Sequence, residues 1–104
     1  MFEGHRYLTR GVAESLPPDL IAAIWNIVDN RKANPHPPLD YLQVFDVVSL
    51  TGASDCPSIV RIVNTQELPP HLVVRLCRVS ETLNVSVWVI DSGAYCTMLL
   101  PHEY

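Results

Sequence analysis

The sequence predicts an α+β fold, with one N-terminal amphipathic helix packed on a mostly antiparallel sheet of about five to six strands. Two patterns support this fold class. Apolar residues before residue 33 recur with the period of a helix, and residues 41–100 largely alternate with the two-residue period of strands. One early helix followed by a run of strands is typical of α+β proteins rather than of parallel α/β sheets.

Length and composition favour one domain that spans residues 1–104. The 104 residues lie near the most common domain size, 48% of them are hydrophobic and only 17% are charged. Disordered chains show the opposite balance, with few apolar residues and many charges. We therefore expect one hydrophobic core that needs no disulfide bond or metal ion to form.

The helix is the most clearly predicted element. Pro17 and Pro18 precede the segment LIAAIWNIVDNRK, and proline fits the first turn of a helix because its missing N–H would be unpaired there. The proline-rich segment 34–38 ends the helix, since proline cannot continue it. The apolar face has the spacing i, i+4, i+7 and i+8 and is formed by Leu20, Ile24, Ile27 and Val28.

Strand-forming residues recur in the segments 6–12, 41–50, 58–64, 71–79, 85–90 and 95–100. Asp91, Ser92 and Gly93 separate the last two segments, and glycine readily adopts a positive φ, so we predict a hairpin there. Residues 51–57 are expected to form a loop. The two tryptophans, Trp25 and Trp88, suit positions in the core.

The charge balance indicates which partners are compatible with the chain. Eleven acidic residues against seven Lys and Arg give a net charge of −4, and Lys32 is the only lysine. Nucleic-acid binders need a basic face, so direct nucleic-acid binding is disfavoured and a protein with a basic surface is favoured. Arg61, Arg75 and Arg78 lie on strand segments, where we expect them to pair with acids rather than to form a basic patch. A homo-oligomer is also compatible with the sequence.

The cysteines and the apolar runs bear on the cellular compartment. Cys56, Cys77 and Cys96 are odd in number and lack metal-ligand or redox spacing. No apolar run approaches the roughly 20 residues of a membrane helix, and no signal peptide is evident. We therefore predict a reduced cytoplasmic protein with no membrane contact and no cofactor. A metal site combining His71 with Cys77 and Cys96 is the alternative, although core packing of the two cysteines is favoured.

Local catalytic motifs are absent from the sequence. The four glycines are isolated, no serine lies in G-x-S-x-G, and no histidine lies in H-E-x-x-H. An enzyme would need Asp or His residues assembled from separate strands, with Asp40, Asp46 and Asp91 as the acids nearest to apolar strand patterns. Such acids more often pair with arginine or end a strand, so a non-enzymatic protein is favoured over this alternative.

Several segments resemble a small family of proteins from Gram-positive bacteria, the domain of unknown function 960. The resemblance lies in RYLTRGV, LDYLQVF, the pair Gln66 and Glu67 before prolines, VWVIDSG and the tail MLLPHEY. It covers nearly the whole chain and implies no established activity, cofactor or catalytic residue. It does imply similarity to proteins encoded on phage and mobile elements, which favours a role in host interaction.

The segments that carry this resemblance contain polar and aromatic residues that a core would not require. We predict that they form a binding face, with tyrosine and arginine as anchors. The leading hypothesis is a small acidic interaction module, and a more specific one is an inhibitor of a host nucleic-acid enzyme, of the anti-CRISPR type. The predicted binding residues are Arg6, Tyr7, Arg10, Gln43, Gln66, Glu67, His102, Glu103 and Tyr104.

Overall fold

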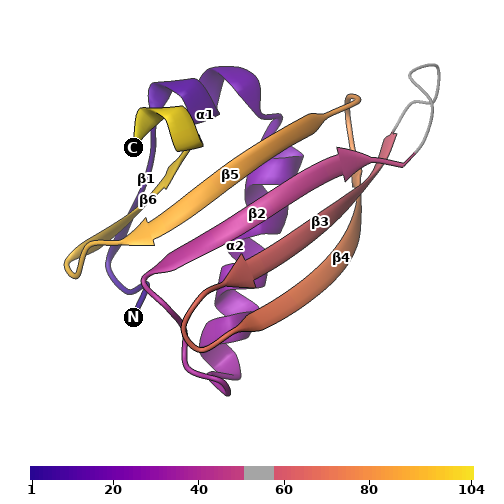
Figure 1. The fold of residues 1–104 in the computed structure, drawn as a ribbon. Helices are drawn as coiled ribbons and strands as arrows, with labels where there is room; N and C mark the ends of the chain where they lie inside the picture. The colour runs from indigo at the N-terminus through magenta and orange to yellow at the C-terminus, as the bar shows by residue number, and fades with distance from the viewer. Residues whose placement is uncertain (51–57) are drawn as a thin grey trace.

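The computed structural model describes residues 1–50 and 58–104 and confirms the predicted α+β class. One long helix lies against one face of a six-stranded sheet (Figure 1). The strands are β1 (His5–Leu8), β2 (Leu42–Ser49), β3 (Ser58–Gln66), β4 (His71–Val79), β5 (Asn84–Asp91) and β6 (Tyr95–Leu99). The helices are α1 (Arg10–Ser15), α2 (Pro18–Ala33) and the 3-10 helix η1 (Pro101–Glu103). The predicted loop at 51–57 lies outside the described residues.

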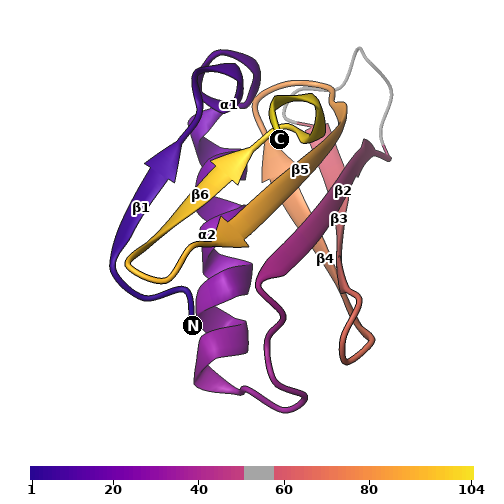
Figure 2. The ribbon, with the colours of Figure 1, turned by 60° about the vertical axis from the view of Figure 1, so that its left-hand side comes forward.

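The sheet has the strand order β1-β6-β5-β2-β3-β4. All neighbouring pairs are antiparallel except β1 and β6, which are parallel. The predicted C-terminal hairpin is confirmed, because β5 pairs with β6 and Gly93 has a φ of +91° in the turn. Figure 2 shows β1 beside β6 at the edge of the sheet, with α2 behind the strands. None of the helices in the described part of the chain is long and apolar enough to span a membrane.

Helix α2 confirms the predicted amphipathic helix and its apolar face. Leu20, Ile24, Ile27 and Val28 are all buried. They meet the alternate residues of the sheet that face α2, among them Phe45 of β2. The remaining sheet residues of this core are Val47, Val60, Ile62, Val79, Val87, Val89, Cys96 and Met98. Phe2, in the polar N-terminal segment, is also buried in the core and was not predicted there.

The predicted first strand over residues 6–12 is too long, because it ends at Leu8 and helix α1 follows. Thr9 is the N-cap of α1, and its hydroxyl accepts a hydrogen bond from the Val12 N–H at 3.3 Å. A threonine cap satisfies one of the N–H groups that a helix start leaves unpaired. Val12 is then buried in the core. This capping pattern was the available signal for α1 in the sequence.

Glu103 connects the C-terminal segment to the start of α1. Its Oε1 accepts hydrogen bonds from the Thr9 hydroxyl at 2.6 Å and from the Leu100 N–H at 2.8 Å, and its Oε2 accepts one from the Gly11 N–H at 3.3 Å. These bonds, above all the one from Thr9, hold the pKa of Glu103 below its usual value. A Cβ on Gly11 would lie 2.7 Å from Oε2, so glycine leaves the space that the carboxylate occupies. Sequence-distant ends of the chain are thereby fastened together.

Gln43 and Gln66 form a buried polar network with Asn64 on the side of the sheet that faces the core. Gln66 Oε1 accepts a hydrogen bond from Gln43 Nε2 at 2.7 Å, and Gln43 Oε1 accepts one from Asn64 Nδ2 at 3.2 Å. Gln66 Nε2 donates to the carbonyls of Pro38 and Pro69 at 2.8 and 2.7 Å. The network therefore holds the two proline-containing connectors against each other, since buried polar groups are costly unless they are paired.

We predict that Gln66→Leu destabilises the fold by about 3 kcal/mol, because it leaves two carbonyls and two N–H donors of the network without partners. Urea unfolding followed by circular dichroism measures the change. The matched control is Glu67→Gln at the next, exposed position, which should change stability by less than about 0.5 kcal/mol. Equal stability of the two variants would contradict the role given to the network.

We also predict that Glu103→Gln destabilises the fold at neutral pH but not in acid. Because folding lowers the pKa of Glu103, the contribution is present above the pKa of the unfolded state and is lost as pH falls through that of the folded state. The stability difference between the two proteins should thus shrink between pH 7 and about pH 3. Urea unfolding across this range measures it, with Glu81→Gln, at an exposed position before β5, as the control. A difference that does not vary with pH would contradict the assignment.

Candidate functional site

The face of the sheet opposite α2 is the main candidate site, and we call it the open face. It is formed by the alternate residues that point away from the core. Cross-strand register places Trp88, Val44, Thr65 and Leu72 in one row across β5, β2, β3 and β4. The other apolar and aromatic residues on this face are Tyr7, Leu42, Val48, Ile59, Val63, Val74, Leu76, Ile90, Tyr95 and Leu99.

Three neighbouring apolar residues of β4 are largely exposed on the open face. Leu72, Val74 and Leu76 keep 58%, 50% and 65% of their surface exposed, and we call them the β4 strip. Strand β4 is the edge of the sheet, so the strip lies beside unpaired backbone groups. Natural proteins avoid a long, apolar, exposed edge unless another surface covers it. The strip therefore has the properties of a contact surface.

Aromatic pairs occupy the other half of the open face. Tyr7 of β1 and Tyr95 of β6 contact edge to face, with ring centroids 5.6 Å apart. Tyr104 lies against Trp88 at the same separation, beyond the end of η1. Trp88 was expected in the core, but its register with Val44 places it on the open face, where it is half-buried. Exposed tyrosines with apolar surroundings are common anchors in protein interfaces.

Two arginines border the β4 strip on the open face. Arg61 of β3 lies opposite Leu76, and Arg78 of β4 lies opposite Ile59. The expected pairing with acids does not occur, since neither arginine forms an ion pair within residues 1–50 and 58–104. Arg75, the third member of the predicted group, points to the opposite side of β4, toward α2. The strip thus has cationic groups at its border and apolar groups at its centre.

The structure does not bring the nine predicted binding residues together. Tyr7 and Tyr104 lie on the open face, whereas Gln43 and Gln66 are buried in the network described above. Glu103 holds the start of α1. The others are spread over β1, α1, the β3–β4 turn and η1, at Arg6, Arg10, Glu67 and His102.

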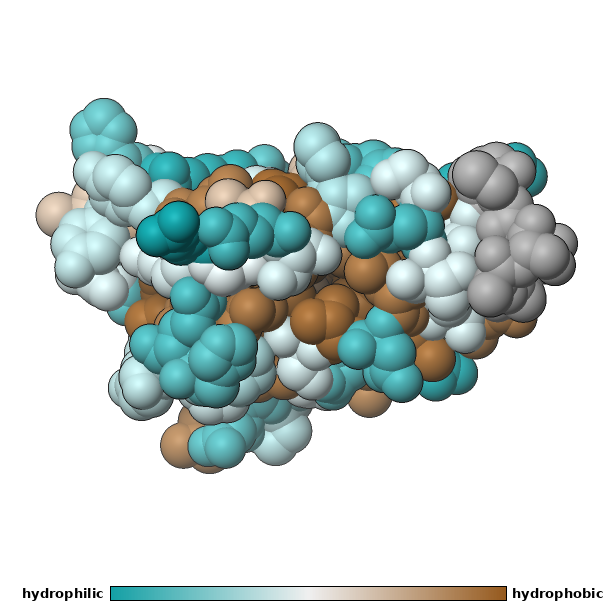
Figure 3. Space-filling view, turned by 90° about the horizontal axis from the view of Figure 1, so that it is seen from above, coloured by the Kyte–Doolittle hydropathy of each residue, from teal (hydrophilic) through white to brown (hydrophobic). Residues whose placement is uncertain are grey.

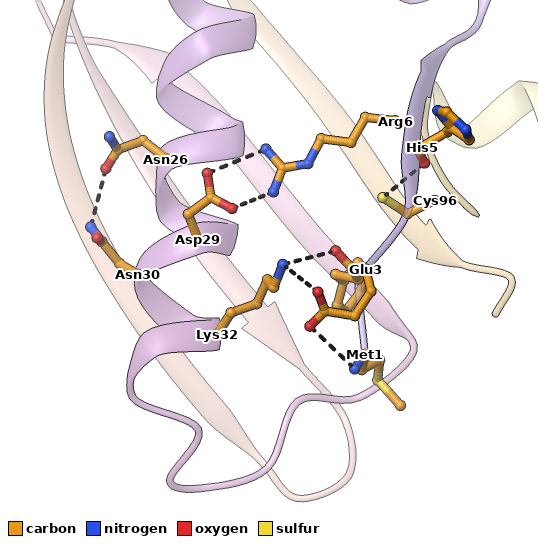
Figure 4. Close-up of polar contacts among 10 residues, drawn as sticks. Met1, Glu3, His5, Arg6, Asn26, Asp29, Asn30, Lys32 and Cys96 are labelled. Atoms are coloured by element: carbon orange, nitrogen blue, oxygen red, sulfur yellow. Dashed lines mark hydrogen bonds and ion pairs between the residues drawn. The ribbon is translucent and has the colours of Figure 1, made fainter. Parts of the chain in front are cut away.

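Arg6 lies on the α2 side of β1 and fastens this edge strand to the helix (Figure 4). Two guanidinium nitrogens donate to the carboxylate of Asp29, and the guanidinium carbon lies 4.7 Å from the centroid of the Trp25 ring. The hydrogen bonds from Arg6 hold the pKa of Asp29 below its usual value. Lys32 bonds the Phe2 carbonyl and the Glu3 carboxylate at 3.2 Å each, so the N-terminal segment is held in the same way. Arg10 forms an ion pair within α1, with Glu14 at 2.9 Å.

The strand order separates the residues of the hypothetical metal site. His71 and Cys77 lie on β4, whereas Cys96 lies on β6, and β5, β2 and β3 run between these strands. Within the described ranges, no group of three or more His, Cys, Asp and Glu residues is placed to hold a metal ion. Cys96 is buried, and burial raises the pKa of its thiol, as expected for a core residue.

The three acids considered for catalysis make local structural bonds. Asp40 accepts hydrogen bonds from the N–H groups of Tyr41 and Leu68, at 2.8 and 3.2 Å. Asp46 accepts one from the Ser86 hydroxyl at 2.6 Å across β2 and β5. Asp91 accepts the Gly93 N–H at 3.4 Å within the hairpin turn. These bonds explain the acids as turn and cross-strand residues rather than as members of one assembled site.

Hydrophobic side chains also reach the surface at the end of the molecule that carries α1 and η1. In the view onto this end they lie between hydrophilic side chains rather than in one large continuous area (Figure 3). The open face therefore differs from this end by its row of neighbouring apolar side chains, which the register across the strands establishes.

Comparison with known proteins places the chain in a family. The model of the family described as "Staphylococcal protein of unknown function (DUF960)" matches residues 5–103. The chain belongs to this family. It is also similar to a solved protein of unknown function from Enterococcus faecalis, with 29% sequence identity and a TM-score of 0.81 over 100% of this chain and 98% of that one. No curated protein matches the chain. The resemblance inferred from the sequence is thus confirmed.

Proposed function

We propose that this protein is a small non-enzymatic interaction module that binds another protein through the open face. The observation that supports the proposal is the β4 strip, in which three neighbouring apolar side chains remain at least half exposed on an edge strand. These side chains do not contribute to the hydrophobic core, which forms on the other side of the sheet. Burial of such side chains against a partner would be favourable by about 25 cal/mol for each Å² removed from water.

The charges around the strip define the chemistry of the partner. Arg61 and Arg78 have no ion-pair partner in the described part of the chain, and they would face any protein that covers the strip. A complementary surface therefore has an apolar centre with carboxylates at its border. The proposed partner is a protein with such a surface, and a second copy of this chain is the alternative outcome of the test.

The more specific hypothesis, a mobile-element inhibitor of a host nucleic-acid enzyme, requires a different surface. Its support is the net charge of −4, which favours association with a basic groove. Such a groove would repel Arg61 and Arg78 at the border of the β4 strip. An inhibitor of the anti-CRISPR type would thus have to present acidic side chains away from the open face, such as those of Glu14 and Asp19 near the α1–α2 junction.

The double substitution Leu72→Ser and Leu76→Ser tests the proposal. Because both side chains are largely exposed, each change should alter stability by no more than about 0.5 kcal/mol. The matched control is Leu68→Ser in the β3–β4 turn, where leucine is 75% exposed but lies outside the β4 strip. Light scattering measures self-association, and affinity capture from a staphylococcal lysate with quantitative mass spectrometry measures partner binding.

The expected result is a protein that the wild type and the control retain and the double variant loses. Its direct binding to the purified chain should then weaken at least tenfold in the double variant, since each 1.4 kcal/mol of lost contact energy is a factor of ten. A wild-type dimer that becomes monomeric in the double variant would identify the second copy as the partner. If all three proteins are monomeric and retain the same set of proteins, the open face is not the binding surface.

A further inference from the structure

A cavity of about 210 Å³ lies between the C-terminal half of α2 and the α2 side of β4. It is several times larger than the roughly 30 Å³ that one water molecule occupies in the liquid. Two aliphatic side chains form part of its wall. The other lining residues are Asn30, Arg31, Asn34, His36, His71 and Arg75.

Arg31 is the unusual member of this wall, because it is a buried cation without an acidic partner in the described part of the chain. It is only 6% exposed. Two guanidinium nitrogens donate to the carbonyls of Asn34 and Pro37, at 2.9 and 2.6 Å, whereas Nε has no hydrogen-bond partner in residues 1–50 and 58–104. The two carbonyls offset the charge only partly, since each is a dipole and not an anion. Buried arginines are normally paired with a carboxylate, and none is within ion-pair distance among the described residues.

The desolvation of Arg31 is a second sign that its positive charge is not neutralised. Burial lowers the pKa of its guanidinium, and no acid of the described segments raises it. The contrast with Arg6 is direct, since Asp29 raises the pKa of that arginine. An anion beside Arg31 would restore the balance, because opposite charges interact strongly where water is partly excluded.

The opposite wall of the cavity adds further hydrogen-bond donors. His71 and Arg75 are on the same side of β4, because residues two or four apart along a strand share a face. Arg75 forms no ion pair in the parts of the chain that are described. His36 approaches from the connector after α2. A neutral imidazole still has one N–H donor, and the guanidinium group has five.

The charge of this wall is opposite to the charge of the whole protein. Of the eleven acidic residues in the sequence, all but Asp55 lie in the described part of the chain, and none of these lines the cavity, while two arginines and two histidines do. A wall with two arginines and two histidines is unexpected in an acidic chain. Such a group of positive charges and N–H donors is typical of a site that binds an oxyanion. Guanidinium groups bind phosphate and carboxylate groups with two parallel hydrogen bonds.

We propose that this cavity binds an oxyanion, the phosphate or carboxylate group of a ligand, between Arg75 and Arg31. Arg75 and the imidazoles of His71 and His36 supply the direct hydrogen bonds. Arg31 supplies a positive charge at the inner wall, where it also closes the end of α2 through its two carbonyl contacts. This site is independent of the open face, since the side chains of Arg75 and Arg78 point to opposite sides of β4.

The test compares Arg75→Gln with Arg78→Gln in titrations followed by ¹⁵N NMR. Both variants remove one positive charge from an exposed position of the same strand, but only Arg75 lines the cavity. The probes are inorganic phosphate and acetate, each added against sodium chloride at the same ionic strength. Arg31 is left intact, because its replacement would also remove the contacts at the end of α2.

The expected result is a saturable shift of amide signals around the cavity, including those of Ile27 and Val73. Arg75→Gln should weaken binding about tenfold, the effect of losing one charge-assisted hydrogen bond, while Arg78→Gln should leave it unchanged. Saturation by phosphate alone would assign a phosphate-bearing ligand, and saturation by acetate alone a carboxylate. The proposal is overturned if neither probe saturates at concentrations of tens of millimolar, well above a Kd of about 1 mM. It is also overturned if both variants respond equally.

Discussion

The structure depends on the burial of one helix against one face of one sheet. A helix about 10 Å wide covers roughly two strands at their spacing of about 4.8 Å, whereas this sheet has six strands. The core therefore forms between α2 and alternate residues of the strands, and the opposite face receives no helix from the described part of the chain. Both proposed surfaces arise because one helix cannot cover six strands. The open face lies on the uncovered side, and the cavity lies where α2 meets β4.

Polar contacts fix the segments of the chain that the packing of α2 on the sheet does not hold in place. Gln66 links the two connectors at one end of the sheet, and Glu103 links η1 to α1 at the other end. Between them, Arg6 fastens the edge strand β1 to α2 through Asp29. Each of these three side chains connects segments that are distant in the sequence, so each contributes to the tertiary arrangement rather than only to local helix or strand formation. Polar residues in these family-like segments thus serve the fold as well as any binding role.

The two proposed sites differ in chemistry as much as in position. The β4 strip is apolar, exposed and suited to a large partner surface, whereas the cavity is small, rich in hydrogen-bond donors and suited to a single anionic group. Neither depends on the other, because the side chains of β4 alternate between the two sides of the sheet. Strand β4 thereby contributes to both surfaces. His71, Val73 and Arg75 line the cavity, and the residues that alternate with them, Leu72, Val74 and Leu76, lie on the open face.

The sequence by itself determined the helix over Pro18–Ala33, the strand alternation and the C-terminal hairpin, because these follow from local periodicity and turn residues. Only the tertiary structure decided which alternate set is buried. In β4 the more apolar set, Leu72, Val74 and Leu76, faces outward, and the set containing Arg75 faces α2. Periodicity specifies that a strand has two faces but not which one meets the helix. The same limit applies to Gln43 and Gln66, whose burial depends on partners more than 20 residues apart in the chain.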